Sequence, residues 1–178
     1  NIGSEVAKIA KSLEMNVIVY DPFLSAERIE SLDAEKSSLD EVLKYSDFVS
    51  LHLPLMKNTK NIIDLNQIKK MKKTSYLINA ARGGLINEND LYKALKAEFI
   101  AGAALDVFEK EPLANSPLHS LNNIILTPHL GASTAEAQDA ASIQISNQIS
   151  DYLKNGTIIN SVNMSSITGN ERKILGPY

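Results

Sequence analysis

Short runs of apolar residues, many of them β-branched, recur along the chain and alternate with segments that carry helix signals. The runs are nearly continuously apolar, which is typical of parallel strands covered on both faces. Strand and helix alternating in this way predict an α/β fold with a doubly wound parallel sheet. The predicted strands are Asn16–Tyr20, Phe48–Leu51, Tyr76–Asn79, Ala101–Leu105 and Ile124–Leu126.

The helix signals lie between these runs. Residues 3–13 have a helical pattern, Ser38 with Glu41 forms a capping-box pair, and Asn87 precedes a helical segment over 88–97. Helix signals and predicted strands thus alternate along the chain, as the doubly wound arrangement requires.

The pattern changes after Pro128, where a single long helix is predicted. Ser133 and Glu136 have capping-box spacing, no Pro or Gly interrupts the chain from there to Lys154, and Asn155-Gly156 ends the helix. At ~1.5 Å per residue such a helix is ~30 Å long, enough to cross a domain. Its apolar positions at helical spacing are Ile145, Ile149 and Leu153.

These patterns divide the chain into three parts. Residues 1–128 form the sheet domain, 129–163 form a crossover helix and a strand, and 164–178 read as the start of a polar linker. The chain begins with Asn1 and enters helix-like sequence directly, so we expect a piece of a longer protein that lacks the first strand of the sheet.

Composition excludes several classes of function. Eighteen basic and 21 acidic residues give a net charge of −3, so no basic face for nucleic acid is expected. The longest nearly uncharged apolar stretch, 99–105, is far shorter than a membrane span, and residues 1–13 mix Glu and Lys, unlike a secretory signal. The absence of cysteine excludes disulfides, thiolate nucleophiles and zinc–sulfur sites, and it is compatible with a cytoplasmic location.

The first residues resemble part of a dinucleotide-binding unit. Gly3 lies at the start of a predicted helix, where free N–H groups hold a pyrophosphate, and Asp21 follows the next strand, where an acidic residue binds ribose hydroxyls. A carboxylate at Asp21 would also repel a 2′-phosphate and favour NAD over NADP. The same residues are equally well explained as a helix-start glycine and a turn aspartate before Pro22.

Three polar segments each follow a predicted strand. The carboxyl ends of parallel strands form one edge, where ligands bind in open α/β sheets. The sequence therefore delivers one Arg, one or two carboxylates and one His to a single edge. The segments are Asn79–Gly84, Asp106–Leu113 and Thr127–Ser133.

This set of side chains suits the oxidation of a secondary alcohol beside a carboxylate. His129 can take the hydroxyl proton as hydride leaves, and a carboxylate such as Glu111 would fix its tautomer and stabilise the imidazolium. Arg82 offers a bidentate fork for the substrate carboxylate and polarises the carbonyl in the reverse direction. Each residue alone could be a surface ion pair, a loop histidine or plain turn chemistry, but their ordered occurrence after successive strands favours the catalytic interpretation.

The motifs resemble those of the D-isomer-specific 2-hydroxyacid dehydrogenases, over residues 1 to about 163. Asn79–Gly84 is similar to the family's N-A-x-R-G segment, and Asp106–Leu113 to its D-V-F-x-x-E-P segment. Pro128–Gly131 is similar to its P-H-x-G segment, and Leu51–Leu55 to its L-H-x-P-L loop. The resemblance implies a Rossmann-type NAD-binding domain over 1–128, NAD as cofactor, a small 2-hydroxy acid as substrate, and a homo-oligomer formed through this domain.

The resemblance also implies roles for individual residues. Arg82, Glu111 and His129 would be catalytic. Asn1, where the family usually has Arg, would give the pyrophosphate only backbone groups. The residues implied to bind the cofactor are Asn1, Ile2, Asp21, Leu53, Ala80, Ala81, Arg82, Asp106, His129, Gly131 and Ala132.

The tail points to one branch of the family. Ser161-Val162-Asn163 followed by Gly176-Pro177-Tyr178 is similar to the long phosphoglycerate dehydrogenases, which oxidise 3-phosphoglycerate to 3-phosphooxypyruvate in serine biosynthesis and continue into regulatory domains. Two alternatives share the motifs: a glyoxylate or hydroxypyruvate reductase, and a corepressor relative that binds NAD without catalysis.

Two further histidines receive no catalytic role. His52 lies in the predicted cofactor loop, where we expect a structural function, and His119 lies in a polar turn. No spacing of His or acidic residues suits metal ligands, so no metal is expected.

Overall fold

The computed structural model describes residues 2–163, so the predicted linker over 164–178 and Asn1 lie outside the described residues. The chain divides into two compact units, residues 1–129 and 130–178, and each is described by itself.

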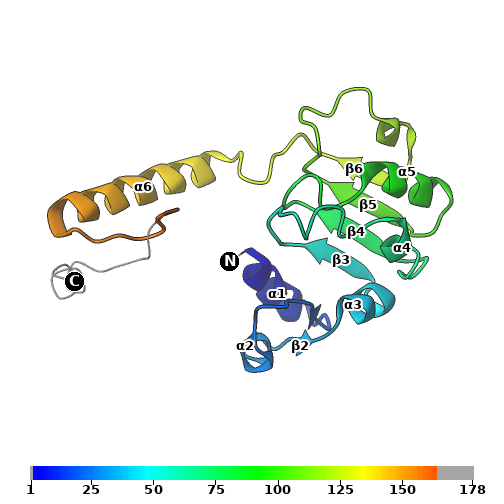
Figure 1. Ribbon diagram of the computed structural model, residues 1–178, viewed down its shortest axis with the longest axis horizontal. Coiled ribbons are helices and arrows are strands. Elements are labelled where there is room, and N and C mark those ends of the chain that lie inside the picture. Colours follow the sequence, from blue (N-terminus) through cyan, green and yellow to red (C-terminus); the bar gives the residue numbers. More distant parts are fainter. Residues whose placement is uncertain (1, 164–178) are drawn as a thin grey trace. The chain divides into compact units, whose positions relative to one another are not determined.

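A four-stranded parallel sheet forms the centre of the first unit (Figure 1). Its strands are β3 (Phe48–Leu51), β4 (Tyr76–Asn79), β5 (Gly102–Leu105) and β6 (Ile124–Leu126), hydrogen-bonded in that order. The register pairs Leu51 with Asn79 and Asn79 with Leu105, so the carboxyl ends of three strands finish at the same level. The predicted runs over 48–51, 76–79 and 124–126 are confirmed residue for residue, and the run over 101–105 loses only its first residue.

A smaller parallel sheet comes from the amino-terminal part of the chain. Helix α1 (Ile2–Ser12) precedes β1 (Ile18–Val19), and α2 (Ala26–Glu30) connects β1 to β2 (Glu35–Lys36). The strand expected over 16–20 is thus reduced to two paired residues. The parallel α/β class is confirmed, in two separate sheets rather than one.

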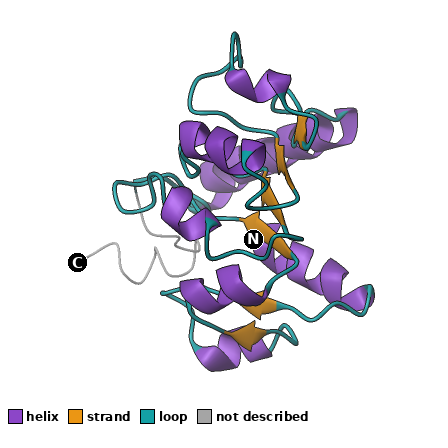
Figure 2. Ribbon diagram, turned by 90° about the vertical axis from the view of Figure 1, so that its right-hand side faces the viewer, coloured by secondary structure: helices purple, strands orange, loops and turns teal. Residues whose placement is uncertain are grey.

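Helices lie beside the strands (Figure 2), and those that contribute to the apolar core pack against one face of the larger sheet. These are α3 (Leu39–Tyr45), α4 (Leu65–Ile68), α5 (Glu88–Lys96) and the 3₁₀ helix η1 (Pro117–Ser120). They bury alternate strand residues in one apolar core, whose fully buried members include Leu43, Ile68, Leu77, Leu91, Leu95 and Leu118.

The opposite face of this sheet carries exposed aromatic rings. Phe48 is 53% exposed and Tyr76 is 45% exposed, and their rings stack with centroids 5.5 Å apart. Burial alternates along β3 and β4, so the expectation of strands covered on both faces is wrong for these two strands.

Two helix starts follow the sequence signals. The Ser38 hydroxyl accepts from the Glu41 N–H and the Glu41 carboxylate accepts from the Ser38 N–H, which confirms the capping box of α3. The Asn87 side chain accepts from the Asp90 N–H at the start of α5. Both caps satisfy N–H groups that the helix itself leaves without a partner.

The second unit contains α6 (Ala135–Asn155), one residue longer at its carboxyl end than predicted. Its N-cap is Thr134, whose hydroxyl accepts from the Ala137 N–H, so the predicted capping box of Ser133 with Glu136 is wrong. Gly156 ends the helix in the left-handed conformation with φ 66°, as its position predicts. After it, Ile158 forms a single β-bridge in place of the expected strand.

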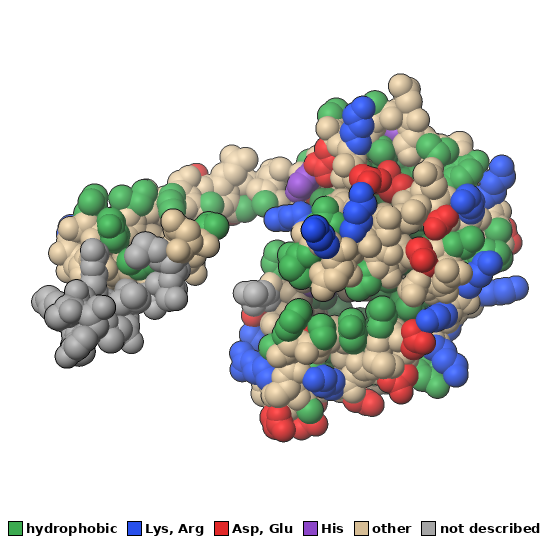
Figure 3. All heavy atoms as spheres, viewed as in Figure 1, with side chains coloured by type: hydrophobic (Ala, Val, Ile, Leu, Met, Phe, Trp, Pro, Cys, Tyr) green, Lys and Arg blue, Asp and Glu red, His purple; other side chains and the backbone are tan. Residues whose placement is uncertain are grey.

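The surface of the first unit mixes charges of both signs. Acidic and basic side chains are interspersed on the face shown in Figure 3, in keeping with the net charge of −3. Among the described residues, no helix has the length and apolar character needed to cross a membrane.

Candidate active site

The sequence-predicted catalytic residues of the first unit all follow the carboxyl ends of neighbouring strands. Arg82 lies three residues after β4, Glu111 lies in the loop after β5, and His129 lies three residues after β6. Since β4, β5 and β6 are adjacent and parallel, the sheet brings the three loops to one edge.

Glu111 and His129 form a hydrogen-bonded pair. The His129 Nδ1 lies 2.7 Å from the Glu111 Oε2, and the other carboxylate oxygen, Oε1, accepts from the Phe108 N–H at 3.0 Å. The His129 hydrogen bond, followed by the Phe108 N–H, holds the pKa of Glu111 below its ordinary value of 4.5. Glu111 is therefore a carboxylate near neutral pH, and Nδ1 carries a proton directed at it. Proton exchange with a substrate then falls to the Nε2 of His129.

The backbone of His129 adopts a conformation that residues other than glycine rarely take. Its φ is 56°, in the left-handed region, and its N–H donates to the Thr127 carbonyl at 3.0 Å. Left-handed backbone at a non-glycine residue carries a cost that functional sites often tolerate. Here it occurs at the residue whose imidazole bonds Glu111.

Glu109 is distinguished from Glu111 by its contacts. Its carboxylate pairs with Lys60 at 3.3 Å, and its backbone N–H donates to the Glu88 carboxylate at 2.6 Å. The structure thus selects Glu111 from the two carboxylates as the partner of His129.

Asp106 is fixed by a neighbouring loop. The Thr127 hydroxyl donates to its Oδ1 at 2.6 Å, which ties the first residue after β5 to the first residue after β6. This bond orients the carboxylate that sequence analysis associated with the cofactor.

Arg82 lies on a tight turn held by Asn79. The Asn79 Nδ2 donates to the Arg82 carbonyl at 2.9 Å, and its Oδ1 accepts from the Ala81 N–H at 3.1 Å. The Arg82 guanidinium donates to the Ala81 carbonyl at 2.6 Å. Gly83 then passes so close to Phe108 that a Cβ added to it would lie 1.8 Å from the Phe108 carbonyl oxygen.

The elements of the dinucleotide motif lie in the same unit. Ile2 at the start of α1 is 74% exposed, and a Cβ added to Gly3 would lie 3.0 Å from the Cβ of His52, in the loop after β3. Asp21 follows β1, and its Oδ1 accepts from the N–H groups of Phe23 at 2.8 Å and Leu24 at 3.2 Å. The start of α1 is thus placed beside the carboxyl end of β3.

The remaining predicted cofactor residues fall in different places. Leu53 and Ala81 pack against the core, and Ala80 is exposed in the Arg82 turn. Gly131 and Ala132 belong to the second unit, and Asn1 lies outside the described residues. The roles of these residues as cofactor ligands remain predictions.

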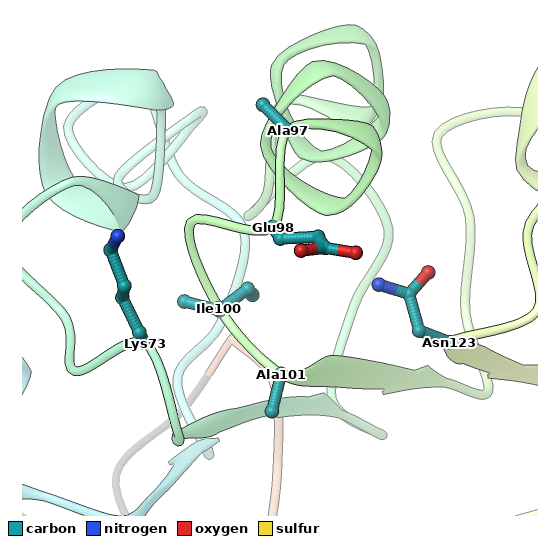
Figure 4. A pocket seen from close by; sticks show the side chains of 6 residues that line it. All are labelled: Lys73, Ala97, Glu98, Ile100, Ala101 and Asn123. Atoms are coloured by element: carbon teal, nitrogen blue, oxygen red, sulfur yellow. The ribbon is translucent and has the colours of Figure 1, made fainter.

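A surface pocket lies at the other edge of the sheet (Figure 4). Its lining residues Lys73, Ala101 and Asn123 precede strands rather than follow them, with Glu98 above them. It is therefore separate from the candidate site. Among residues 2–163, no three His, Cys, Asp or Glu side chains are grouped to hold a metal ion.

Sequence reasoning missed the residues that support the site. Asn79, Gly83 and Thr127 lie inside the predicted segments, but none was given a role. One signal was available for Asn79, because an amide that ends an apolar strand must find hydrogen-bond partners.

The family model for the D-isomer specific 2-hydroxyacid dehydrogenase NAD-binding domain matches residues 1–131. The D-3-phosphoglycerate dehydrogenase of Methanocaldococcus jannaschii is 47% identical over 178 residues, which cover 99% of this chain and 34% of that protein.

Solved structures give the same result. A glyoxylate reductase from Paecilomyes thermophila matches with a TM-score of 0.82 and 34% identity, over 91% of this chain and 49% of that one. A D-isomer specific 2-hydroxyacid dehydrogenase from Lactobacillus delbrueckii ssp. bulgaricus, in its NAD-complexed form, matches with a TM-score of 0.76 and 35% identity, over 90% and 52% of the two chains.

The parallel α/β sheet agrees with these matches. The chain spans about a third of the length of the curated phosphoglycerate dehydrogenases that it resembles. It belongs to the D-isomer specific 2-hydroxyacid dehydrogenase family, of which it contains the NAD-binding domain.

Proposed function

We propose that the full-length protein oxidises D-3-phosphoglycerate to 3-phosphooxypyruvate with NAD. The observation that carries the chemistry is the Glu111–His129 pair at the carboxyl edge of the sheet, beside the loop that bears Arg82. The substrate is supported by curated relatives named D-3-phosphoglycerate dehydrogenase, which match 99% of the chain at 41–47% identity.

The residues present fit a dinucleotide. The exposed start of α1, the side-chain-free Gly3 beside the loop after β3, and the carboxylate of Asp21 after β1 supply N–H donors and a ribose acceptor. Asn1 and Ile2 would hold the pyrophosphate, and Asp21 the ribose. Leu53, Ala80, Ala81, Asp106, Gly131 and Ala132 would line the nicotinamide half. When bound, NAD accepts the hydride from the substrate carbon.

His129 takes the hydroxyl proton on its Nε2 during oxidation. The Glu111 carboxylate, 2.7 Å from Nδ1, keeps that nitrogen protonated and stabilises the imidazolium that forms. In the reverse direction the same imidazolium returns the proton to the carbonyl oxygen. General acid–base transfer of this kind contributes about 10²–10⁴-fold in rate.

Arg82 binds the substrate carboxylate. A guanidinium matches a carboxylate with two parallel hydrogen bonds and stabilises negative charge on the adjacent oxygen. The hydrogen bond that Arg82 makes to the Ala81 carbonyl would be exchanged for the substrate. Arg82 would also contact the cofactor.

Two further properties belong to the same proposal. We place the protein in the cytoplasm and expect a homo-oligomer that assembles through the NAD-binding domain. Size-exclusion chromatography with light scattering on the full-length protein tests the second expectation, and a monomer would contradict it.

The function is tested by NADH formation from purified full-length protein. We expect reduction of NAD with D-3-phosphoglycerate, and at least ~10²-fold less with His129→Gln, the lower end of the range for general acid–base catalysis. Preferential turnover of glyoxylate or hydroxypyruvate would instead support the reductase that a 40% identical relative from Thermococcus litoralis represents. NAD binding without any turnover would support a corepressor relative.

A further inference from the structure

Asn79 has a buried side chain whose whole amide group is directed at the turn that carries Arg82. It is only 2% exposed and ends β4. Its oxygen accepts from the Ala81 N–H and its nitrogen donates to the Arg82 carbonyl, so both halves of the amide bind the same turn. A buried amide left without these partners would be costly, so the turn and the amide fix each other.

The backbone of Asn79 joins the same turn to the next loop. Its carbonyl accepts from the Asp106 N–H at 2.9 Å, which links the end of β4 to the first residue after β5. The turn that bears Arg82 is therefore anchored to the sheet beside Asp106, the first residue of the loop after β5.

Gly83 and Phe108 connect the turn that bears Arg82 to the Glu111–His129 pair. The Gly83 Cα lies against the Phe108 carbonyl, since a Cβ there would come within 1.8 Å of its oxygen. The N–H of Phe108 donates to Glu111 at 3.0 Å, and Glu111 binds His129. A displacement of the turn toward Phe108 would thus disturb the Phe108 peptide, whose N–H orients Glu111 and through it His129.

We propose that Asn79 is a positioning residue: its side-chain amide sets the place of Arg82 relative to the Glu111–His129 pair. The proposal rests on the proposed function, because it assumes that Arg82 binds the substrate carboxylate. Asn79 itself touches neither substrate nor cofactor and acts through Arg82.

The test is a double-mutant cycle on the full-length protein with Asn79→Ala and Arg82→Ala. The readout is the dissociation constant of oxalate from the enzyme–NADH complex, with the NADH dissociation constant measured beside it. Asn79→Ala should weaken oxalate by about 10-fold, the scale of one or two lost hydrogen bonds. In the Arg82→Ala background it should change oxalate affinity less than about 2-fold, because sites that act as a unit are not additive.

Ser75→Ala is the matched control at the other end of the same strand. Ser75 is fully buried and its hydroxyl donates to the Lys72 carbonyl at 2.7 Å. This change should lower the unfolding temperature and leave oxalate affinity unchanged in both backgrounds. If Asn79→Ala does not fold, Asn79→Ser replaces it in the cycle, since it retains one hydrogen-bonding group.

Equal loss of oxalate affinity from Asn79→Ala in both backgrounds would overturn the proposal, as would an unchanged affinity in the wild-type background. If the wild-type protein binds no oxalate, or if Arg82→Ala alone leaves its affinity intact, the proposed function fails first and this inference fails with it.

Discussion

At the scale of single residues, the site depends on close contacts that leave little space for other side chains. The Phe108 peptide has Gly83 against its carbonyl and Glu111 on its N–H. Sequence motifs located Glu111 and His129, and the fold adds the contacts that distinguish Glu111 from Glu109. The sequence places both carboxylates in one short loop, whereas Glu109 is withdrawn by Lys60.

Gly83→Ala should disrupt this contact. A methyl group 1.8 Å from the Phe108 oxygen forces the backbone apart, and such overpacking costs about 1–3 kcal/mol of unfolding free energy. Urea denaturation measures the loss of stability, and kcat/KM of the full-length protein should fall with it. Gly156→Ala, in the left-handed cap of α6, is the control that should reduce stability alone. A Gly83→Ala protein with wild-type stability and activity would refute the close packing.

The lowered pKa of Glu111 predicts that part of the unfolding free energy is lost at acid pH. Its pKa is lowered below 4.5 by the His129 hydrogen bond and then by the Phe108 N–H. A carboxyl group with a depressed folded-state pKa stabilises the fold above 4.5, and this contribution is lost as pH falls through the folded-state value. Glu111→Gln should therefore flatten the acid side of a stability–pH curve measured by urea denaturation. Glu109→Gln, an exposed ion-pair control, should leave the curve's shape intact.

At the scale of elements, patterning predicted the strands of the larger sheet. β3, β4 and β6 are apolar runs between helix signals, and they appear at the predicted positions. β2 (Glu35–Lys36) could not be predicted because it is two charged, exposed residues that become a strand only by pairing with β1. α4 is four residues long, too short for helical periodicity to show. At α6 the sequence offers two adjacent hydroxyl residues as N-cap, Ser133 and Thr134. Only the structure shows that the helix begins after Thr134.

The capping box of α3 supplies a test at this scale. Ser38→Ala removes the hydroxyl that accepts from the Glu41 N–H, so it should cost about 1 kcal/mol of unfolding free energy. Ser37→Ala is a close control, since Ser37 also donates to the Glu41 carboxylate, at 3.0 Å, but caps no helix N–H that the structure shows. We expect a smaller loss there. Equal losses in the two variants would mean that the cap itself contributes nothing.

At the scale of the whole molecule, the residues predicted to bind the cofactor lie at the start of α1, after β1 and after β3 to β6. The general α/β class was predictable, because strand and helix signals alternate along the sequence. The division into two sheets was not, since it depends on which strands pair, and pairing is not local.

Asp21 should determine the choice between NAD and NADP. Its carboxylate follows β1 and would face a 2′-phosphate, so the full-length protein should prefer NAD, and Asp21→Ala should erode that preference. Steady-state kcat/KM for both cofactors measures this. Asp33→Ala, which removes a surface partner of Lys11, is the control and should not change the ratio. Equal use of NADP by the unmutated protein would show that Asp21 has no such role.

In the proposed mechanism Glu111 orients His129 and stabilises its imidazolium form, while His129 transfers the proton. The most direct measurement is a set of pH–rate profiles for alcohol oxidation and carbonyl reduction by the full-length protein, wild type against Glu111→Gln. Removing the negative charge 2.7 Å from Nδ1 makes the imidazolium less favourable. We therefore expect the oxidation profile to move to lower pH and reduction to weaken earlier as pH rises. Profiles that overlay and differ only in height would contradict it.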